Sequence, residues 1–563
     1  MYLHLLTRRL LSSVFLSAFV LLLLLGTGSS LYGQFSLSTC RDIKQKEASL
    51  GITLFRNLTS IDDCVLFIID TNSLYKQLQL GSPADLPFVK ARPENVEISA
   101  ARRFTRKDLD MHYQEMRAPN FQVLRHSPTG TTPVPFSTLV EARYTYEGKV
   151  KDKPESQVAL YATPQFVSGF ILMPDEGWVF IEPLVPLLRA NNPDLTDAQL
   201  LNLANALGEP ISPFTHIVYN AADTNFRIRL DTIVRDPQDP RPALKVCASA
   251  RTSELAKALD ANENGHLDDD EILQALQTWI SDALIPSTNL GIDDEAMVGL
   301  LGFWVGEGLI CEGLTITAVG DTKFLALDET IDRGVGGATM RTWWQRQDEV
   351  LLLASTIFSS INLPLKEKAL EIWESGGPQS ESADALLCQL MSSSYTEAGF
   401  VHLFTGQDLQ PISRGSDSGR IGGRGQLEII GLTAGIGGYG TPKQVSSNCL
   451  DPTAPASNHS LSQQVPDRSM LELSENVNHY EATLMQRVLL LTHELAHTMN
   501  AQHVNSTLLS DLCVFENSVC GESLMTPAIS NRQIPRFDVD SRARLLDCFG
   551  KILMGESCIP HPQ

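Results

Sequence analysis

Residues 493–503 read His-Glu-Leu-Ala-His-Thr-Met-Asn-Ala-Gln-His, and this stretch decides how the rest of the chain is interpreted. On a helix, His493 and His497 are four residues apart, so both imidazoles point the same way. His503 supplies a third nitrogen if the helix ends and the chain turns back. Three nitrogens with an open position for water are the arrangement of a catalytic zinc site. Glu494 would then act as the general base toward that water.

The residues around this motif have the pattern of a helix that ends where such a site requires it. Asn500 stands at the expected helix end, and asparagine tolerates a left-handed backbone conformation better than most residues except glycine. A lone HExxH also occurs by accident on buried helices, but three histidines and a glutamate at these offsets are much rarer. Apolar residues recur at helical spacing, away from the histidines, at Leu484, Val488, Leu491, Leu495 and Met499.

Downstream, residues 523–527 read Ser-Leu-Met-Thr-Pro. Taken alone, Met525 is an ordinary core residue, because methionine commonly fills gaps in hydrophobic cores. After the histidine motif, we expect Met525 to form a hydrophobic floor beneath the metal.

The motif and the Met-x-Pro turn together resemble the metzincins, and more narrowly the adamalysin (reprolysin) family of zinc proteases. Asparagine in place of the motif glycine is similar to the branch that carries thrombospondin repeats. Residues 311–318 resemble the first strand of the catalytic domain, residues 402–409 a strand and loop, and residues 430–434 the substrate-binding edge strand. Val504 departs from the family, which usually places aspartate directly after the third histidine.

The resemblance implies a mixed α+β fold. Its catalytic domain, over residues 306–563, would contain a mixed sheet and a long active-site helix of the metzincin type. A mostly β prodomain and an EF-hand helix-loop-helix would precede it. The resemblance also implies that His493, His497 and His503 bind Zn²⁺ and that Glu494 is catalytic. Protein or peptide substrate would pair with the edge strand at Gly431, Leu432 and Thr433.

The first expected unit spans residues 31–240. Short segments alternate as half-buried strands do, at residues 158–161, 169–172 and 178–181. The stretch over residues 146–184 resembles an adamalysin prodomain. An unrelated β sandwich is the alternative, because a fold pattern alone does not establish function.

Residues 241–305 are expected to form a linker with an EF-hand. Gly265 permits the sharp turn of the loop, and helical patterns flank it. The alternative is an acidic, solvated start of a helix. Because EF-hands usually pair, a lone site is expected to stabilise the protein rather than to signal. The expected Ca²⁺ ligands are Asp260, Asn262, Asn264, the His266 carbonyl, Asp268 and a bidentate Glu271.

Cys247 follows a proline-rich linker at residues 236–242. In the adamalysin family a propeptide cysteine can fill the fourth zinc position and exclude water, and thiolate is a good zinc ligand. Cys247 resembles this cysteine switch, although Ala248 stands where glycine is usual. A disulfide, for example with Cys311, is the alternative.

The N-terminus has the pattern of a secretory signal over residues 1–30. Arg8 and Arg9 precede an apolar run at residues 10–25, and small and polar residues follow it. An uncleaved membrane anchor is the alternative. We therefore expect a secreted protein, or a type II membrane protein if the segment is retained.

Charge and cysteine content agree with an extracellular location. The formal charge of −22 argues against nucleic acid and anionic membrane surfaces as partners. Ten cysteines fit an oxidising medium. Glycosylation sequons begin at Asn57, Asn458 and Asn505.

The disulfide pairing is only partly suggested. The resemblance implies one bond between Cys449 and Cys548 and another between Cys513 and Cys520. Proximity in sequence suggests Cys40 with Cys64 and Cys311 with Cys388, which leaves Cys247 and Cys558 over.

Several elements of the catalytic half are also expected from the sequence. We expect a helix over residues 342–362 that continues over residues 365–373, strands near 400–405 and 427–433, and a last helix near 541–546. The whole pattern predicts a secreted zinc endopeptidase that is made as a zymogen and binds calcium. One alternative is a catalytically idle extracellular protein that mediates calcium-dependent binding or adhesion. Another is a calcium sensor or buffer, which a lone loop in so long a chain makes a poor candidate.

Overall fold

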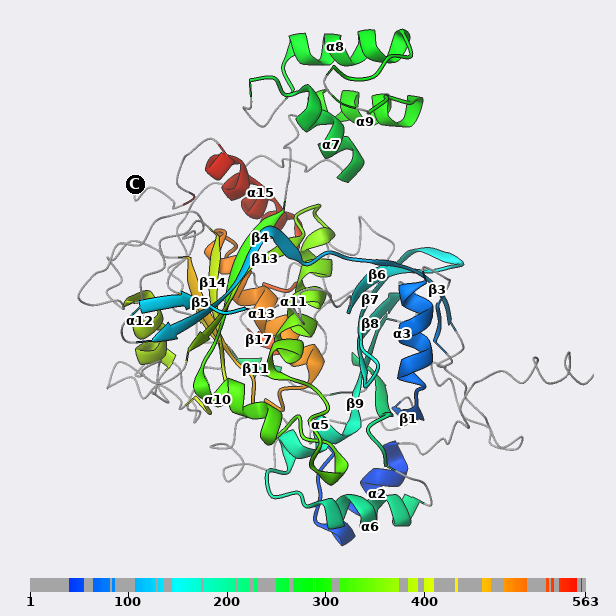
Figure 1. The fold of residues 1–563 in the computed structure, drawn as a ribbon, viewed down its shortest axis with the longest axis vertical. Coiled ribbons are helices and arrows are strands. Elements are labelled where there is room, and N and C mark those ends of the chain that lie inside the picture. The colour runs from blue at the N-terminus through cyan, green and yellow to red at the C-terminus, as the bar shows by residue number, and fades with distance from the viewer. Residues whose placement is uncertain are drawn as a thin grey trace, which may run out of the picture.

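The fold is that of a computed structural model, and it is drawn in Figure 1. The structure describes residues 40–54, 64–80, 84–86, 107–127, 130–135, 144–173, 177–207, 211–221, 224, 227–229, 250–262, 267–286, 288, 290–305, 313–373, 383–392, 399–409, 431–433, 458–466, 480–503, 523–525, 528–530, 536–553 and 558.

The first sheet is antiparallel throughout and has the order β1-β10-β9-β8-β7-β6-β3-β2. The strands predicted at residues 158–161, 169–172 and 178–181 lie in its centre, which confirms them. Its strands are β1 (Val65–Ile68), β2 (Ala84–Leu86), β3 (Lys107–Tyr113), β6 (Thr145–Val150), β7 (Lys153–Ala162), β8 (Val167–Met173), β9 (Gly177–Pro183) and β10 (Thr215–Asn220). These strands belong to the N-terminal half, which is the described part of residues 40–229. The helices of this half are α2 (Cys40–Leu50), α3 (Thr71–Gln79), α5 (Leu184–Asn191) and α6 (Asp197–Leu207).

The second sheet is mixed and has the order β15-β16-β14-β12-β13-β4-β5. Its five central strands are parallel, and its two edge strands pair antiparallel. The strands are β4 (Arg117–Ser127), β5 (Gly130–Pro133), β12 (Leu314–Gly320), β13 (Leu365–Trp373), β14 (Phe400–Thr405), β15 (Gly431–Thr433) and β16 (His459–Gln463). A separate small ladder pairs β11 (Arg227–Arg229) with β17 (Ala528–Ser530).

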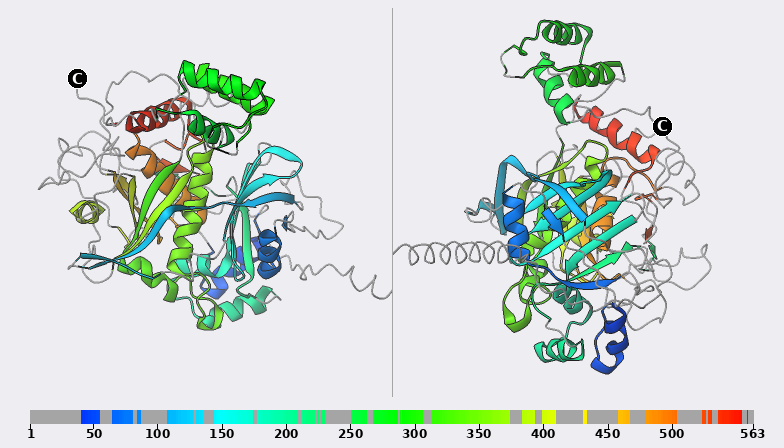
Figure 2. Two further views of the ribbon diagram at one scale, coloured as in Figure 1. Left: turned by 45° about the horizontal axis from the view of Figure 1, so that its top comes forward. Right: turned by 90° about the vertical axis from the view of Figure 1, so that its right-hand side faces the viewer.

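Two long helices lie between the sheets, as Figures 1 and 2 show. Helix α11 (Trp343–Ser359) contacts β7 of the first sheet and β13 of the second, and helix α13 (Leu484–Thr498) contacts β9 and β16. Both are buried around their whole circumference, as expected for helices inside a core. The C-terminal half is the described part of the chain from residue 313 onward. Its remaining helices are α10 (Thr322–Leu325), the 3₁₀ turns at Ala326–Glu329 and Val335–Gly337, α12 (Ala383–Ser392) and α15 (Val539–Leu553).

One hydrophobic core joins the two halves. Phe180 and Tyr219 of the first sheet belong to the same buried cluster as Leu353 of α11 and Leu489 of α13. Smaller clusters lie on the outer faces, between the first sheet and α3 and between the second sheet and α12. The molecule is therefore layered, with both sheets packed on one shared pair of helices.

The expected helix over residues 365–373 is wrong, because these residues form strand β13. Their Lys, Glu, Ala and Leu residues favour a helix in isolation. In the folded chain β13 has a parallel neighbour on each side, β12 and β4, which satisfy its backbone hydrogen bonds. Glu367 and Glu371 are only 2% and 0% exposed, so their charges do not mark a solvated face.

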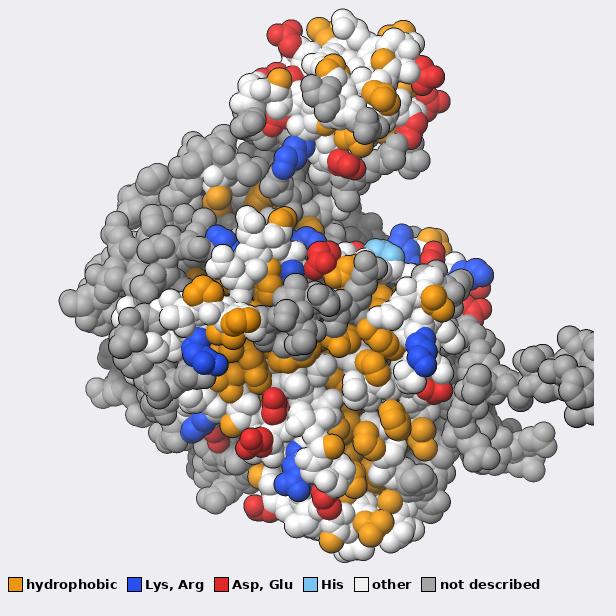
Figure 3. All heavy atoms as spheres, in the orientation of Figure 1, with side chains coloured by type: hydrophobic (Ala, Val, Ile, Leu, Met, Phe, Trp, Pro, Cys, Tyr) orange, Lys and Arg blue, Asp and Glu red, His pale blue; other side chains and the backbone are white. Residues whose placement is uncertain are grey.

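A third unit projects from the rest of the molecule (Figure 1). It contains α7 (Ala250–Leu259), α8 (Asp269–Ile280) and α9 (Asp294–Val305), packed on a core of their own. Acidic and hydrophobic side chains both lie on the face of this unit that Figure 3 shows. Leu273, Ile280 and Val298 are among its exposed hydrophobic residues. Helices α7 and α8 flank the predicted calcium loop.

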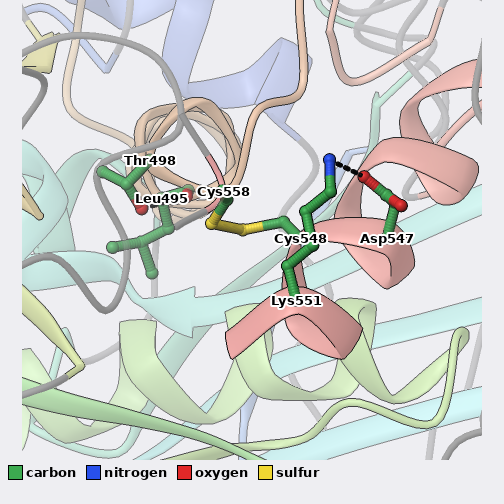
Figure 4. Close-up of a disulfide and its surroundings, with 6 residues drawn as sticks. All are labelled: Leu495, Thr498, Asp547, Cys548, Lys551 and Cys558. Atoms are coloured by element: carbon green, nitrogen blue, oxygen red, sulfur yellow. Dashed lines mark hydrogen bonds and ion pairs between the residues drawn. A yellow bond between two sulfur atoms is a disulfide. The ribbon is translucent and has the colours of Figure 1, made fainter. Parts of the chain in front are cut away.

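The disulfides correct part of the expected pairing. Cys40 bonds to Cys64, as proximity suggested. The implied bond between Cys449 and Cys548 is wrong, because Cys548 of α15 bonds to Cys558, which is therefore not left over. This bond closes a short local loop, with Cα atoms 4.7 Å apart, and lies next to the last turns of α13 (Figure 4).

The other expected disulfides lie partly or wholly outside the described residues. Cys388 is disulfide-bonded, and its expected partner, Cys311, lies outside the described residues. Its pairing with Cys311, and that of Cys513 with Cys520, stay predictions.

The structure also bears on one predicted glycosylation site and on the predicted N-terminal signal segment. Asn458 is 3% exposed and its side-chain amide donates to the Gly399 carbonyl, so this sequon is not accessible in the folded protein. The expected signal segment at residues 1–30 lies outside the described residues. Within the described part of the chain, none of the helices has the length and hydrophobicity needed to cross a membrane.

Candidate metal centre

The helix that carries the motif is specified locally at both ends. The Thr483 hydroxyl caps its first turn by accepting the Gln486 backbone N–H at 3.3 Å, and the Gln486 side chain accepts the Thr483 N–H in return. The last helical residue is Thr498, and Asn500 has a φ of +69°. The asparagine therefore takes the left-handed conformation that the sequence predicted, and the chain reverses toward His503.

This reversal brings three imidazoles together. His493 Nε2 lies 3.0 Å from His497 Nε2, and both lie 3.1 Å from His503 Nε2. Of the described residues, these three form the one group of histidine, cysteine or acidic side chains close enough to hold a metal ion. The structure thus places the three predicted histidines at a single point.

Backbone carbonyls orient two of the rings. His493 Nδ1 donates to the Leu524 carbonyl at 2.8 Å, and His497 Nδ1 donates to the Ala501 carbonyl at 2.8 Å. Because a carbonyl only accepts, each ring carries its proton on Nδ1 and directs the Nε2 lone pair at the centre. Such contacts on the far side of the ring are typical of histidines that bind a metal.

Burial keeps the rings neutral. It lowers the pKa of His493 well below its ordinary value, and His497 and His503 lower it further. Burial also lowers the pKa of His497 to about 4 and that of His503 to about 3. At neutral pH the site therefore presents unprotonated nitrogens, the form that a metal ion binds.

The spacing of the nitrogens fits zinc. Their triangle has sides of 3.0, 3.1 and 3.1 Å. The centre of such a triangle is about 1.8 Å from each corner, and a Zn–N bond is about 2.0–2.1 Å long. A bond of this length would therefore let one zinc ion reach all three nitrogens. Three converging lone pairs repel one another, and a shared cation removes that repulsion.

The turn around Met525 contacts the site through the Leu524 carbonyl, and a hydrophobic floor formed by Met525 stays a prediction. Met525 is fully buried, and its backbone N–H donates to the Ser523 hydroxyl at 3.1 Å. The Ser523 hydroxyl donates to Asp538 at 2.5 Å, and Asp538 also accepts the Ser541 N–H at the start of α15. These contacts hold the Leu524 carbonyl against His493. The roles of Leu524, Ser523 and Asp538 were not predicted, because nothing in the sequence pairs position 493 with position 524.

Glu494 lies one residue after His493 on α13 and is 4% exposed. A carboxylate at this helical position is on nearly the same side as the two helix histidines. Its role in catalysis stays a proposal.

The predicted substrate strand lies at the edge of the second sheet. Residues Gly431–Thr433 form β15, which pairs antiparallel with β16, and Gly431 faces Ser462 in the register. One side of β15 therefore has no strand neighbour within the described sheet. The cysteine-switch candidate, Cys247, lies outside the described residues.

The predicted calcium loop is described in part. The Glu271 carboxylate accepts the backbone N–H of Ala261 at 2.8 Å and that of Asp268 at 3.0 Å, so it spans both ends of the loop. The Asn262 amide donates to Asp268 at 2.7 Å. Asp260 follows directly after α7. Asn264 and His266 lie outside the described residues, so the calcium site stays a prediction.

Comparisons with known proteins add little to this geometry. No family model and no curated protein matches the chain. Among solved structures, the chain is similar to archaemetzincin from Methanopyrus kandleri, with 16% sequence identity. The match covers 42% of this chain and 96% of that chain, with a TM-score of 0.23. So weak a likeness establishes neither the family nor the activity of this chain.

Proposed function

We propose that this protein is a secreted, zinc-dependent endopeptidase of the adamalysin type. The observation that carries the proposal is the convergence of three neutral imidazole nitrogens, 3.0–3.1 Å apart, from His493, His497 and His503. The motif that contains them also supplies an acidic residue, Glu494, at the first position after His493.

In this proposal the residues of the chain have distinct tasks. The three histidines hold the ion, and a bound zinc supplies a Lewis acid that polarises the scissile carbonyl and acidifies a water molecule. Glu494 takes a proton from the attacking water and delivers it to the leaving amine. The Leu524 and Ala501 carbonyls hold two of the rings in the required orientation.

Substrate would bind along β15. An extended peptide can add to a free sheet edge through main-chain hydrogen bonds, with specificity from the pockets beside it. The backbone of residues Gly431–Thr433 has this position in the sheet. Protein or peptide chains are therefore the proposed substrates.

The proposal also includes calcium binding, secretion and synthesis as a latent form. The helix-loop-helix of α7 and α8 and the ligand spacing from Asp260 to Glu271 support a calcium site. The disulfides Cys40–Cys64 and Cys548–Cys558 fit an oxidising compartment. Latency would come from Cys247 as a zinc ligand. If the N-terminal segment is retained, the protein is instead anchored in a membrane.

A second candidate is a catalytically idle extracellular protein that uses calcium for binding or adhesion. The acidic surface and exposed hydrophobic residues of the α7–α9 unit favour it. Hydrolysis of casein that a chelator blocks and zinc restores would separate the two candidates.

The decisive test uses metal content and one substitution. Purified full-length protein should hold about one zinc ion per chain and cleave casein after activation. Glu494→Gln should retain the zinc and lose at least about 100-fold in kcat, because general base catalysis contributes about 10²–10⁴-fold. The matched control is Glu155→Gln, an exposed glutamate on β7, which should behave as the parent does. Loss of zinc in Glu494→Gln would give that residue a structural role and contradict the assignment.

A further inference from the structure

The N-terminal sheet makes a direct, buried contact with the start of the helix that carries the zinc motif. The Leu484 backbone N–H, at the first residue of α13, donates to the Glu182 carboxylate of β9, with distances of 3.2 and 3.3 Å to its two oxygens. The Tyr219 hydroxyl of β10 donates to the same carboxylate at 2.8 Å. The first N–H groups of a helix have no partner within the helix, so a buried start needs an acceptor from elsewhere.

A second contact reaches α13 through α11. Arg487, six residues before His493, donates to Glu349 Oε1 at 2.8 Å. Glu349 Oε2 accepts the Ser168 hydroxyl of β8 at 2.6 Å. All three side chains are buried, so the N-terminal sheet, α11 and the zinc-motif helix share one hydrogen-bonded chain.

Two strands of the N-terminal half also complete structure in the C-terminal half. Strand β4 pairs parallel with β13 and is continuous with the second sheet. Strand β11 pairs with β17, with Arg227 opposite Ser530 and Arg229 opposite Ala528. Strand β17 begins three residues after Met525, so this ladder lies next in sequence to the turn that supports His493.

Removing the N-terminal half would undo all of these contacts at once. The Leu484 N–H would lose its acceptor, Glu182, and the Glu349 carboxylate would lose its donor, Ser168. The shared core would lose the residues of the first sheet, such as Phe180, that belong to the same cluster as Leu489. Unpartnered polar groups and exposed core surface both oppose folding. The contacts that would break include the one to Leu484 on α13, the helix that also carries His493 and His497.

We propose that Glu182 is a positioning residue for the zinc-motif helix and that the N-terminal half is a permanent part of the active enzyme, not a propeptide that dissociates. This inference rests on the proposed function. It allows the enzyme to become active without dissociation of the N-terminal half. The candidate switch residue, Cys247, follows the N-terminal half in sequence, so latency in this proposal would depend on Cys247 and not on release of that half.

The first test cuts the full-length chain between its halves. A specific protease site is inserted into residues 236–242 of full-length Cys247→Ala protein, in which the proposed cysteine switch is removed, and the purified protein is cleaved under native conditions. Both fragments should then co-elute with zinc content and casein hydrolysis within twofold of the uncut protein. If the fragments separate and the C-terminal one keeps zinc and activity, the inference is overturned. Co-elution with zinc retained but no hydrolysis before or after cutting would support this inference and contradict only the proposed function.

The second test addresses Glu182 itself. Glu182→Ala should bind zinc about tenfold more weakly in chelator competition, because contacts that orient a metal site affect affinity by about 10–100-fold. Its kcat should fall while KM changes by less than twofold. Glu182→Gln should restore both values, since its amide oxygen can still accept the Leu484 N–H. The control is Glu155→Ala on the exposed part of β7, with parental values expected. Folded Glu182→Ala with parental zinc affinity would refute the positioning role.

Discussion

Arg487 of α13 donates a hydrogen bond from Nη2 to Glu349 Oε1 of α11 at 2.8 Å, and neither side chain is exposed to solvent. Burial opposes ionisation of Glu349, but the guanidinium groups of Arg341 and Arg487 outweigh it and lower the pKa of Glu349 to about 2. The same Arg341 reaches Asp332 at 2.6 Å, and Arg346 reaches Asp332 at 3.1 Å. The two helices between the sheets are therefore joined by a buried network of charges.

Replacing Arg487 by Met should destabilise the protein by about 3–5 kcal/mol, because it leaves the buried Glu349 carboxylate with one partner fewer. Urea denaturation followed by far-UV circular dichroism measures this value. The control is Lys551→Met on α15, whose partly exposed pair with Asp547 should contribute only about 0–1 kcal/mol. A loss below about 1 kcal/mol for Arg487→Met would mean that the network contributes little to stability.

The buried His402 should make the protein sensitive to acid. Its ring nitrogens each lie 2.8 Å from a serine hydroxyl, those of Ser460 and Ser462, and burial lowers the pKa of His402 to about 3. In the unfolded chain its pKa is about 6.5, so below that pH the unfolded state binds more protons. The contribution of His402 to the free energy of unfolding is then fully present above about pH 6.5 and is lost as the pH falls toward 3.

His402→Gln should flatten the dependence of unfolding free energy on pH between 4 and 6.5. The measurement is a series of urea titrations in a chelator, so that metal binding does not contribute. His112→Gln serves as control, since the His112 side chain is 66% exposed and its pKa is raised by a hydrogen bond to Glu147. An unchanged slope in His402→Gln would show that other groups control acid unfolding.

Calcium should stabilise the parent protein through the loop between α7 and α8. A rise in thermal midpoint with added Ca²⁺ is expected, because ligand binding to the folded state stabilises it. Glu271→Gln should reduce the calcium affinity by about tenfold or more, because it removes the bidentate ligand. Calorimetric titration measures the calcium affinity of the parent, of Glu271→Gln and of a control variant. Glu254→Gln on the exposed side of α7 is the control, and equal affinities in all three would remove the calcium site from the proposal.

Cys247→Ala should yield protein that hydrolyses casein without proteolytic processing. The expected reason is that the thiolate no longer occupies the zinc position needed by water. Initial rates of the unprocessed parent and variant provide the comparison. Equal latency in both would exclude the switch, and a disulfide-linked peptide containing Cys247 in a non-reducing digest would then identify the alternative role.

Part of the site follows from sequence because its geometry is local. The spacing of His493 and His497 places both on one side of any helix, and Asn500 permits the left-handed turn that is seen at φ +69°. These features depend on the backbone within a few residues of each position. The strands at residues 158–161 and 178–181 were predicted for the same reason, because alternation is a local property of extended chains.

Other features were missed because distant partners decide them. Strand β13 has a helix-favouring composition, and only its neighbours β12 and β4 make it a strand. The bond between Cys548 and Cys558 is a different case: it is local in sequence, and it was missed because the family likeness implied another partner for Cys548. Leu524, which orients His493, is 31 residues away from it.

By itself, the sequence determined the candidate site: three imidazoles at fixed spacing, an acidic neighbour and the place where the helix ends. Tertiary structure alone decided how that helix is held. The buried carboxylates Glu182 and Glu349 come from elements 302 and 138 residues distant from their partners on α13. Helical period and backbone handedness act between adjacent residues, whereas a buried charge is stable only when a distant partner neutralises it, and no local pattern names that partner.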